Sequence, residues 1–203
     1  MSTKYDTVIF DLGKVVIDFN WRLCIERLEH KVPKELDFSM EMLANSKLLH
    51  EYERGEITRK KFNRDICNRF GNVFTTTEFD EAFNAIFTGV YSQSHAMLQR
   101  LQGNVQLLAL TNINDAHYEY CWEHYEDTLL LFDHVIASHE VGKRKPEKGI
   151  FKHVKNKYEI EVNSTIYLDD LVDNIEAGRE FGFNCIWVKN IDIALQELDF
   201  MLV

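Results

Sequence analysis

The stretch VIFDLGKVV, residues 8–16, places a carboxylate at the point where an apolar run stops. Its first three residues are apolar, Asp11 interrupts them, and Gly13 precedes a second apolar run. An apolar run without polar alternation is typical of a strand that is buried on both faces of a parallel sheet. We therefore expect the strand to hold Asp11 rigidly at its carboxyl end, and Gly13 to let the chain turn tightly there.

Four further apolar runs have the same character, and each ends in polar residues. They are VQLLALTN (105–112), DHVIAS (133–138), TIYLDD (165–170) and NCIWVKN (184–190). The helical patterns between them are NDAHYEYCWEHYE (114–126), PEKGIFKHVKNKY (146–158) and DNIEAGREFG (173–182). Strands that alternate with helices are typical of an α/β fold, so the sequence predicts a Rossmann-like, doubly wound parallel sheet.

The ends of these helical patterns predict where the helices begin and end. Asn112 or Asn114 can cap the first helix, because an asparagine side chain accepts a hydrogen bond from a free backbone N–H. Pro146 is expected at the first position of the second helix. Asp173 is expected to cap the third helix and Gly182 to end it.

Residues from about 20 to 95 follow a different pattern. Segments such as WRLCIERLEHK, TRKKFNRDICNRFG and TEFDEAFNAIFTGV are amphipathic at helical spacing, with no clear strand among them. We therefore expect an all-helical insertion after the first strand. The predicted division is a core domain of residues 1–18 and 96–203 and a helical insertion of residues 19–95.

The composition argues against several classes of protein. The 203 residues carry a formal charge of −10, which disfavours binding to nucleic acid or to an anionic membrane. The four cysteines form no CxxC pair and the eight histidines no HxH or HExxH spacing, so we predict reduced thiols and no zinc site. We find neither a signal peptide nor an apolar run of transmembrane length, and expect a cytoplasmic protein, either a monomer or a weak dimer.

The polar residues that end the apolar runs are expected to converge, because ligands of an open parallel sheet bind beyond the carboxyl ends of its strands. Three carboxylates in a small volume repel one another and require a cation. Oxygen ligands with room for water suit Mg²⁺. The residues expected at this edge are Asp11, Thr111, Asn112, Lys145, Asp169 and Asp170.

A magnesium ion beside a lysine favours chemistry on a phosphate group. Asp11 is predicted to be the nucleophile that forms an aspartyl-phosphate. Lys145 and Thr111 are predicted to neutralise and hydrogen-bond the transferred group. Asn112 is open between a phosphate contact and a helix cap. The sequence does not say which of the two adjacent aspartates binds the metal directly. The predicted metal ligands are Asp11, Gly13 through its carbonyl, Asp169 and Asp170.

Some residues near these motifs have a plainer expected role. Trp21 is expected in the apolar core of the helical insertion rather than against a substrate. Lys143 and Arg144 belong to the same basic run as Lys145, and we expect both of them to be solvated.

Four segments, in this order, resemble the motifs of the haloacid dehalogenase (HAD) superfamily. They are FDLGKV (10–15), LTN (110–112), RKPE (144–147) and YLDDLVDN (167–174). The helical insertion resembles that superfamily's small C1-type cap. HEYERGEIT (50–58) and DLGKVVIDF (11–19) are most similar to the bacterial α-D-glucose-1-phosphate phosphatase branch. The resemblance implies a Mg²⁺-dependent phosphatase that hydrolyses a small phosphorylated metabolite, a sugar phosphate such as a hexose-1-phosphate, through an aspartyl-phosphate.

Gly13 departs from the pattern of the superfamily. Most of its phosphatases carry an aspartate there, which protonates the leaving oxygen and later activates water. The sequence therefore does not identify the general acid/base. A sugar 1-phosphate leaves as a hemiacetal oxygen and depends less on an acid. Two alternatives stay open: a non-enzymatic or weakly active member that binds phosphate or a partner protein and, less favoured, a 2-haloacid dehalogenase, which uses no metal.

Overall fold

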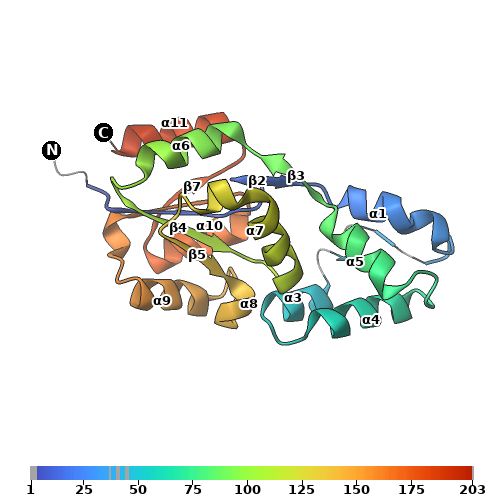
Figure 1. Ribbon diagram of the computed structural model, residues 1–203. Helices are drawn as coiled ribbons and strands as arrows, with labels where there is room; N and C mark the ends of the chain where they lie inside the picture. The colour runs from blue at the N-terminus through green and yellow to red at the C-terminus, as the bar shows by residue number, and fades with distance from the viewer. Residues whose placement is uncertain (1–3, 37, 40–41, 44–45, 203) are drawn as a thin grey trace.

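The computed structural model describes residues 4–36, 38–39, 42–43 and 46–202 of the chain. Among these residues, five parallel strands form one sheet in the order β5-β4-β1-β6-β7 (Figure 1). Each strand lies within one of the five apolar runs, so the predicted α/β sheet is confirmed. The strands are β1 (Thr7–Phe10), β4 (Gln106–Thr111), β5 (His134–Ala137), β6 (Thr165–Asp169) and β7 (Asn184–Trp187).

The strand order reverses at β1, which is the central strand. Phe10 lies opposite Ala109 of β4 on one side and Leu168 of β6 on the other. The chain therefore builds the sheet outward from β1 in both directions, first through β4 and β5 and then through β6 and β7. Asp11 follows β1 directly, and so it lies at the switch point where open α/β sheets bind their ligands.

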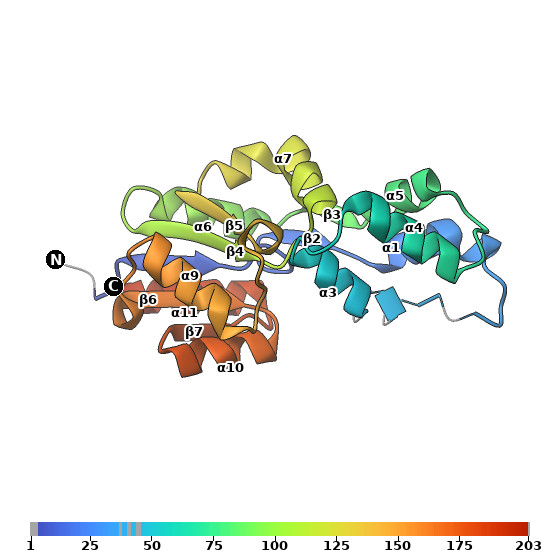
Figure 2. The same ribbon diagram turned by 90° about the horizontal axis from the view of Figure 1, so that it is seen from below.

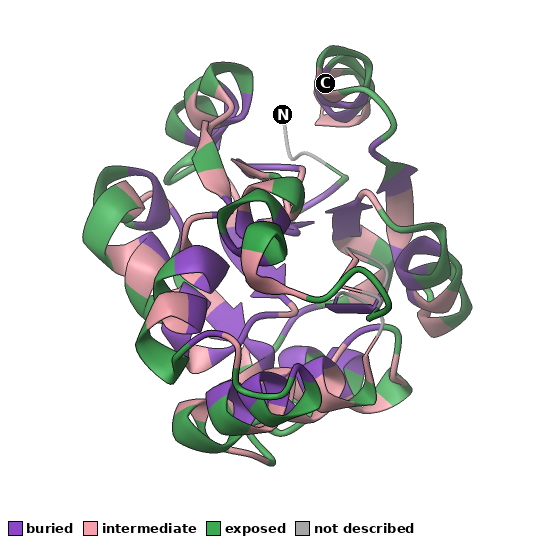
Figure 3. Ribbon diagram, turned by 90° about the vertical axis from the view of Figure 1, so that its right-hand side faces the viewer, coloured by how far each residue is buried: buried purple, intermediate pink, exposed green. Residues whose placement is uncertain are grey.

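Helices cover both faces of the sheet, and Figure 3 shows its strands as the buried centre of this layer. Val8 and Phe10 of β1 pack into an apolar cluster with α6, α7 and α11, whereas Ile9 packs into a cluster with α9 and α10. Both β1 and β6 are consequently buried along their whole length. The helices are α6 (Ser92–Leu101), α7 (Asp115–Leu129), α8 (Ser138–Val141), α9 (Lys148–Lys157), α10 (Val172–Phe181) and α11 (Ile191–Leu202), with the 3₁₀ turn η2 (Val162–Ser164).

The helices that lie between residues 22 and 84 pack around an apolar cluster of their own, at one end of the molecule (Figure 2). This cluster is rich in aromatic rings, with Phe62 between Tyr52 and Phe83 at centroid distances of 4.6 and 5.1 Å. We keep the division into a core domain and a helical insertion as a proposal. The elements are α1 (Arg22–Leu28), the 3₁₀ turn η1 (Glu29–Lys31), α3 (Lys47–Glu53), α4 (Arg59–Arg69) and α5 (Thr76–Asn84).

The prediction that residues 19–95 are all helical is wrong at its edges. Strands β2 (Ile17–Phe19) and β3 (Phe87–Val90) pair antiparallel and join the insertion to the sheet. Each has four residues or fewer and is only partly buried. Such short strands lack the alternation that a sequence pattern needs, and β3 contains the glycine Gly89, which is uncommon inside strands.

The helix ends partly follow the sequence. Asn114, not Asn112, caps α7, and Gly182 ends α10 with a φ of 109°. Pro146 lies two residues before α9, whose cap is Glu147, so its predicted place in the helix is wrong. Asp173 is also not a cap, because Leu171 precedes α10 and Asp173 is inside its first turn. A carboxylate there still complements the positive end of the helix dipole.

All four cysteines are free thiols, as predicted, and three of them are buried. Within the part of the chain that the structure describes, no helix combines the length and the apolar character that crossing a bilayer requires.

Candidate active site

Asp11 is held at the carboxyl end of β1 by hydrogen bonds on both its backbone and its side chain. Its N–H donates to the Leu168 carbonyl of β6 at 2.8 Å. Its Oδ1 accepts from the backbone N–H of Leu12 at 2.7 Å and lies 3.0 Å from Lys145 Nζ. Oδ2 has no such partner among the described residues. One oxygen of Asp11 is therefore fixed and the other is available for chemistry.

Lys145 lies completely buried beneath Asp11. Its ammonium contacts three oxygens: the Leu110 carbonyl at 2.7 Å, Asp169 Oδ2 at 2.7 Å and Asp11 Oδ1 at 3.0 Å. Burial alone would lower the pKa of Lys145, but the two carboxylates raise it above its usual value, so the side chain stays charged. The ends of β4 and β6 thus enclose the Lys145 ammonium, which the sequence predicted at this edge of the sheet.

Asn112 positions Lys145. Its Oδ1 accepts from the backbone N–H of Lys145 at 2.8 Å, and its Nδ2 donates to the Lys145 carbonyl at 2.9 Å. Both ends of the side-chain amide are thus bonded to the lysine's main chain. Of the two side-chain roles that the sequence left open, the helix cap is wrong. The phosphate contact stays a prediction, because the second N–H of the amide is still available as a donor.

Asp169 is fully buried, and donors surround its carboxylate. Oδ2 accepts from Lys145 and from the Tyr167 hydroxyl. Oδ1 accepts from the Leu171 N–H and from the Asn174 amide, and both of these bonds are 2.9 Å long. A carboxylate offers about four acceptor positions, so those of Asp169 are already filled. This aspartate therefore holds the Lys145 ammonium in place.

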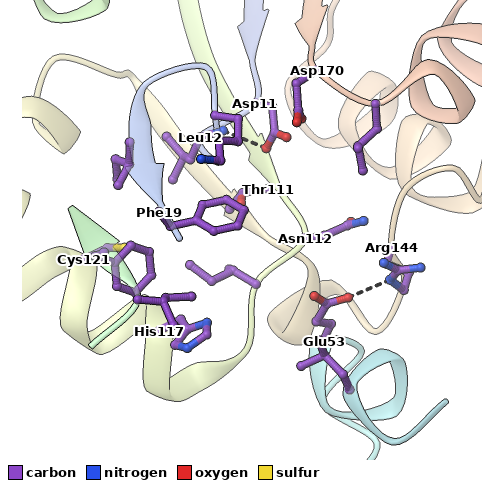
Figure 4. Close-up of a pocket in the computed structure, with 18 of the residues that line it drawn as sticks. Asp11, Leu12, Phe19, Glu53, Thr111, Asn112, His117, Cys121, Arg144 and Asp170 are labelled. Atoms are coloured by element: carbon purple, nitrogen blue, oxygen red, sulfur yellow. Dashed lines mark hydrogen bonds and ion pairs between the residues drawn. The ribbon is translucent and has the colours of Figure 1, made fainter. Parts of the chain in front are cut away.

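Asp170 differs from its neighbour. It is half-buried, lines the cavity, and makes no side-chain hydrogen bond to the described part of the chain. Burial and the adjacent Asp169 raise the pKa of Asp170 to about 6. Figure 4 shows its carboxylate beside that of Asp11.

The three carboxylates fit a divalent cation. One oxygen from each of Asp11, Asp169 and Asp170 lies within 4.8 Å of the others. Burial raises the pKa of Asp11 to about 8, with repulsion from the two other carboxylates partly offset by Lys145. A site of oxygen donors that repel one another favours a hard ion such as Mg²⁺. The described residues thus match the predicted metal centre in chemistry, and Gly13, whose carbonyl is a predicted ligand, lines the same cavity.

A cavity of about 400 Å³ opens above this cluster, between the sheet and the helical insertion (Figure 4). Asp11, Gly13, Thr111, Asn112 and Asp170 all line it. Thr111 is the last residue of β4, and its hydroxyl makes no hydrogen bond to a described residue. The structure therefore brings every predicted site residue to one place. Lys145 and Asp169 lie behind the residues that line the cavity. The individual roles stay predictions.

Arg144 is a site residue that the sequence reading missed, because it was expected to be solvated. Its Nε donates to Glu53 Oε2 of α3 at 2.8 Å, and the two side chains are only 16% and 12% exposed. The Ser138 hydroxyl also donates to the Glu53 carbonyl at 2.6 Å. This pair joins the helical insertion to the sheet at the rim of the cavity. Lys143 is exposed, as expected.

Phe19 is a second missed residue, and it explains Gly13. A Cβ atom at position 13 would lie 2.8 Å from Cε1 of the Phe19 ring. A side chain at position 13, including the aspartate of most superfamily phosphatases, would therefore have to displace this ring. The signal in the sequence was an aromatic residue six positions after the glycine. This signal could not be interpreted from the sequence, because the contact forms only when β2 folds back over the loop that contains Gly13.

A parallel sheet whose strand ends gather an aspartate, a buried lysine and an acidic pair beneath a helical insertion defines a class of hydrolase. Residues 5–182 match the family model of the haloacid dehalogenase-like hydrolases, and the chain belongs to this family. The predicted superfamily is confirmed. The C1 subtype of the insertion and the glucose-1-phosphate phosphatase branch stay predictions.

Three relatives share most of this chain. A sesquiterpene phosphatase of Aspergillus oryzae is 27% identical over 90% of this chain and 89% of its own length. A D-ribitol-5-phosphate phosphatase of Bacteroides thetaiotaomicron is 22% identical over 96% of this chain and 97% of its own. A drimenol cyclase of Aspergillus calidoustus is 24% identical over 94% of this chain, which spans only 35% of that longer protein.

Solved structures show the same fold. A HAD family enzyme of Bacteroides thetaiotaomicron is 25% identical, with a TM-score of 0.80 over 91% of this chain and 94% of its own. Another structure of that enzyme, 23% identical with a TM-score of 0.80 over 91% of this chain and 94% of its own, contains magnesium and inorganic phosphate.

Proposed function

We propose that the protein is a Mg²⁺-dependent phosphatase that hydrolyses a small phosphorylated metabolite through an aspartyl-phosphate on Asp11. The observation that carries the proposal is the asymmetry of this carboxylate. Oδ1 is bonded to the Leu12 N–H and Lys145, while Oδ2 is available in the cavity beside Asp170. A fixed carboxylate with one available oxygen suits attack on phosphorus.

Each residue of the site has a role in this reaction. Asp11 Oδ2 forms a bond to phosphorus as the bond to the alcohol oxygen breaks, and that oxygen takes a proton from water. A water molecule then attacks phosphorus and breaks its bond to Asp11 Oδ2, which releases phosphate and restores the carboxylate. Lys145 balances the charge that collects on Asp11 and the phosphate, and it is pre-oriented by Asp169 and Asn112. The Thr111 hydroxyl donates to a phosphate oxygen, a role supported by its position in the lining of the cavity.

The metal ligands are proposed to be Asp11, Asp170 and the Gly13 carbonyl. Asp169 acts through Lys145, because its acceptor positions are filled. When bound, Mg²⁺ supplies positive charge that offsets the phosphate and the clustered carboxylates. A relative that contains magnesium and phosphate supports this choice of ion.

The alcohol part of the substrate could be polyhydroxylated or apolar, and the relatives support one kind each. The sugar phosphate, such as a hexose-1-phosphate, is the prediction from the sequence, and the relative that is a ribitol-5-phosphate phosphatase supports a polyhydroxylated alcohol. The relative that is a sesquiterpene phosphatase supports an apolar one. Gly13 favours an alcohol that leaves with little help from an acid, because no acid/base group stands at this position. It also keeps the non-enzymatic, phosphate-binding alternative open.

Phosphate release is expected from a panel of phosphate monoesters, including α-glucose-1-phosphate and fructose-1-phosphate, at saturating Mg²⁺. EDTA is expected to abolish the activity and added Mg²⁺ to restore it, because three clustered carboxylates without a cation repel the phosphate dianion. Chloride release from a 2-haloacid in EDTA would instead identify a dehalogenase. Mg²⁺ and beryllofluoride binding without turnover of any ester would identify the non-enzymatic alternative.

A further inference from the structure

The cavity has two chemically different parts. Its polar end is formed by Asp11, Thr111 and Asp170, where the phosphate is proposed to bind. Much of the rest is apolar, and we call six of the residues that line it the apolar wall. The apolar wall consists of Phe19, Trp21, Ile86, Phe87, Ile113 and Cys121.

Ring contacts make the apolar wall continuous. The Trp21 ring lies 6.1 Å from that of Phe19 and 5.8 Å from the imidazole of His117, and Phe87 lies 5.1 Å from the same imidazole. These rings come from β2, β3, α7 and the segment before α1, so the wall forms only when the insertion packs on the sheet. Figure 4 shows Phe19 between the Asp11 end and His117.

His117 adds no hydrogen-bonding group to the wall. Its Nε2–H donates to the Phe83 carbonyl at 3.0 Å, and its Nδ1 accepts from the Asn114 amide at 3.2 Å. Burial also lowers the pKa of His117 to about 4, so the ring is neutral. With both nitrogens occupied, it presents only its ring to the cavity.

Most of the other polar side chains around the cavity are engaged through some of their atoms, whereas the Arg144 Nη groups and Glu53 Oε1 make no hydrogen bond to the described residues. Glu53 is paired with Arg144, and Lys14 is paired with Asp18 at 2.7 Å. Asn112 is bonded to the Lys145 backbone and Asn174 to Asp169. Beyond the phosphate end, His50 is the remaining polar lining side chain in the described chain that makes no such bond. Along the apolar wall, a polyhydroxylated alcohol would lose its water without gaining hydrogen-bond partners, which is unfavourable.

From this lining we infer that the substrate is a phosphate monoester whose alcohol has a hydrocarbon body, and that Phe19 is a specificity-determining residue. The inference rests on the proposed phosphatase and names the class of its substrate. The Phe19 ring lies against the position that a Cβ atom of Gly13 would take, and Gly13 is two residues after Asp11 at the phosphate end. Its ring therefore adjoins the first carbons of the leaving alcohol. A cavity of about 400 Å³ is in the size range of small-molecule sites.

A series of n-alkyl phosphates from methyl to octyl tests this without any mutation. Each methylene that enters the apolar wall is expected to raise kcat/KM about threefold to fourfold, the factor that burial of one methylene supplies. The rise is expected to stop where the cavity ends. Octyl phosphate is expected to exceed ribitol-5-phosphate, because both esters release a primary alcohol and differ in the polarity of its body. A flat series, with ribitol-5-phosphate as the better substrate, would overturn the inference and leave the phosphatase intact.

The affinity of a ligand that is not hydrolysed tests this inference independently of catalysis. Alkylphosphonates cannot be hydrolysed, so their affinity in Mg²⁺, measured by calorimetry, reports the apolar wall alone. Octylphosphonate is expected to bind at least about 30-fold more tightly than methylphosphonate if three or more methylenes are buried. Equal affinities would refute the inference even if no ester is turned over. Tight octylphosphonate binding with no turnover of any ester would support the inference and contradict the phosphatase.

Substitution of Phe19 tests whether its ring causes the dependence of kcat/KM on alkyl chain length. Phe19→Ala is expected to flatten the dependence of kcat/KM on chain length, so that octyl phosphate loses more activity than methyl phosphate. The matched control is Phe181→Ala, because Phe181 is also partly buried but packs on Phe151 and Phe183, away from the cavity. It is expected to keep the wild-type dependence. If Phe19→Ala does not fold, the wild-type alkyl series still decides. An unchanged dependence in a folded Phe19→Ala protein would contradict the role of this ring.

Discussion

Asp11→Asn is expected to lower phosphate release by at least about 10⁴-fold, the scale seen when a reacting group is removed from an enzyme. The asparagine Oδ1 can still accept from the Leu12 N–H and Lys145, so the loop keeps its shape. The amide nitrogen, however, replaces the oxygen that attacks phosphorus. The measurement is steady-state phosphate release at saturating Mg²⁺, together with a thermal unfolding curve.

The unfolding midpoint of this variant is expected to stay the same or rise. Burial has raised the pKa of Asp11 to about 8, so the native state holds this carboxylate against a cost that asparagine avoids. Asp173→Asn is the matched control, because Asp173 is exposed in the first turn of α10 close to the site. It is expected to keep activity within about twofold. Wild-type turnover in Asp11→Asn would refute the assignment of the nucleophile.

Lys145→Met is expected to damage both stability and catalysis. Methionine keeps much of the volume but removes the charge that lies between Asp11 and Asp169. Breaking a buried ion pair by removing one partner costs about 3–5 kcal/mol, and we expect a loss of that size in urea unfolding at pH 8 without Mg²⁺. Phosphate release is expected to fall by about 10²–10³-fold.

The sign of the pH dependence follows from the raised pKa of Asp11. As pH falls below about 8, this carboxyl takes up a proton in the folded protein, whereas in the unfolded chain it stays ionised down to about 3.8. The uncompensated charge in Lys145→Met therefore decreases, and its stability deficit is expected to shrink toward lower pH. Lys143→Met, two residues earlier and exposed, is expected to change neither quantity. Equal stability of the two variants at pH 8 would contradict the structural role of Lys145.

The sheet could be predicted from the sequence because each strand is buried on both faces and so reads as a continuous apolar run. TVIF (7–10) and TIYLD (165–169) are the clearest examples, with every residue buried. The β2 and β3 strands escaped because they are short and half-exposed. Their pairing is set by the insertion and not by a local pattern.

The site could be predicted for a similar reason: parallel strands place their ends at one edge, so Asp11, Thr111 and Asp170 had to lie close together. Contacts between sheet and insertion could not be predicted. The Glu53–Arg144 pair joins residues 91 positions apart, and no local signal links them. The sequence could also not distinguish Asp169 from Asp170. Only the fold shows that Asp169 points into a ring of donors and Asp170 into the cavity.

A single turnover with a phosphate ester carrying radiolabelled phosphorus, stopped with acid at the earliest times, tests the central claim most directly. The account predicts that label appears on the protein before it appears as free phosphate, that it maps to the peptide containing Asp11, and that Asp11→Asn acquires none. Free phosphate that forms without labelled protein at any time, or label on a different residue, would contradict it.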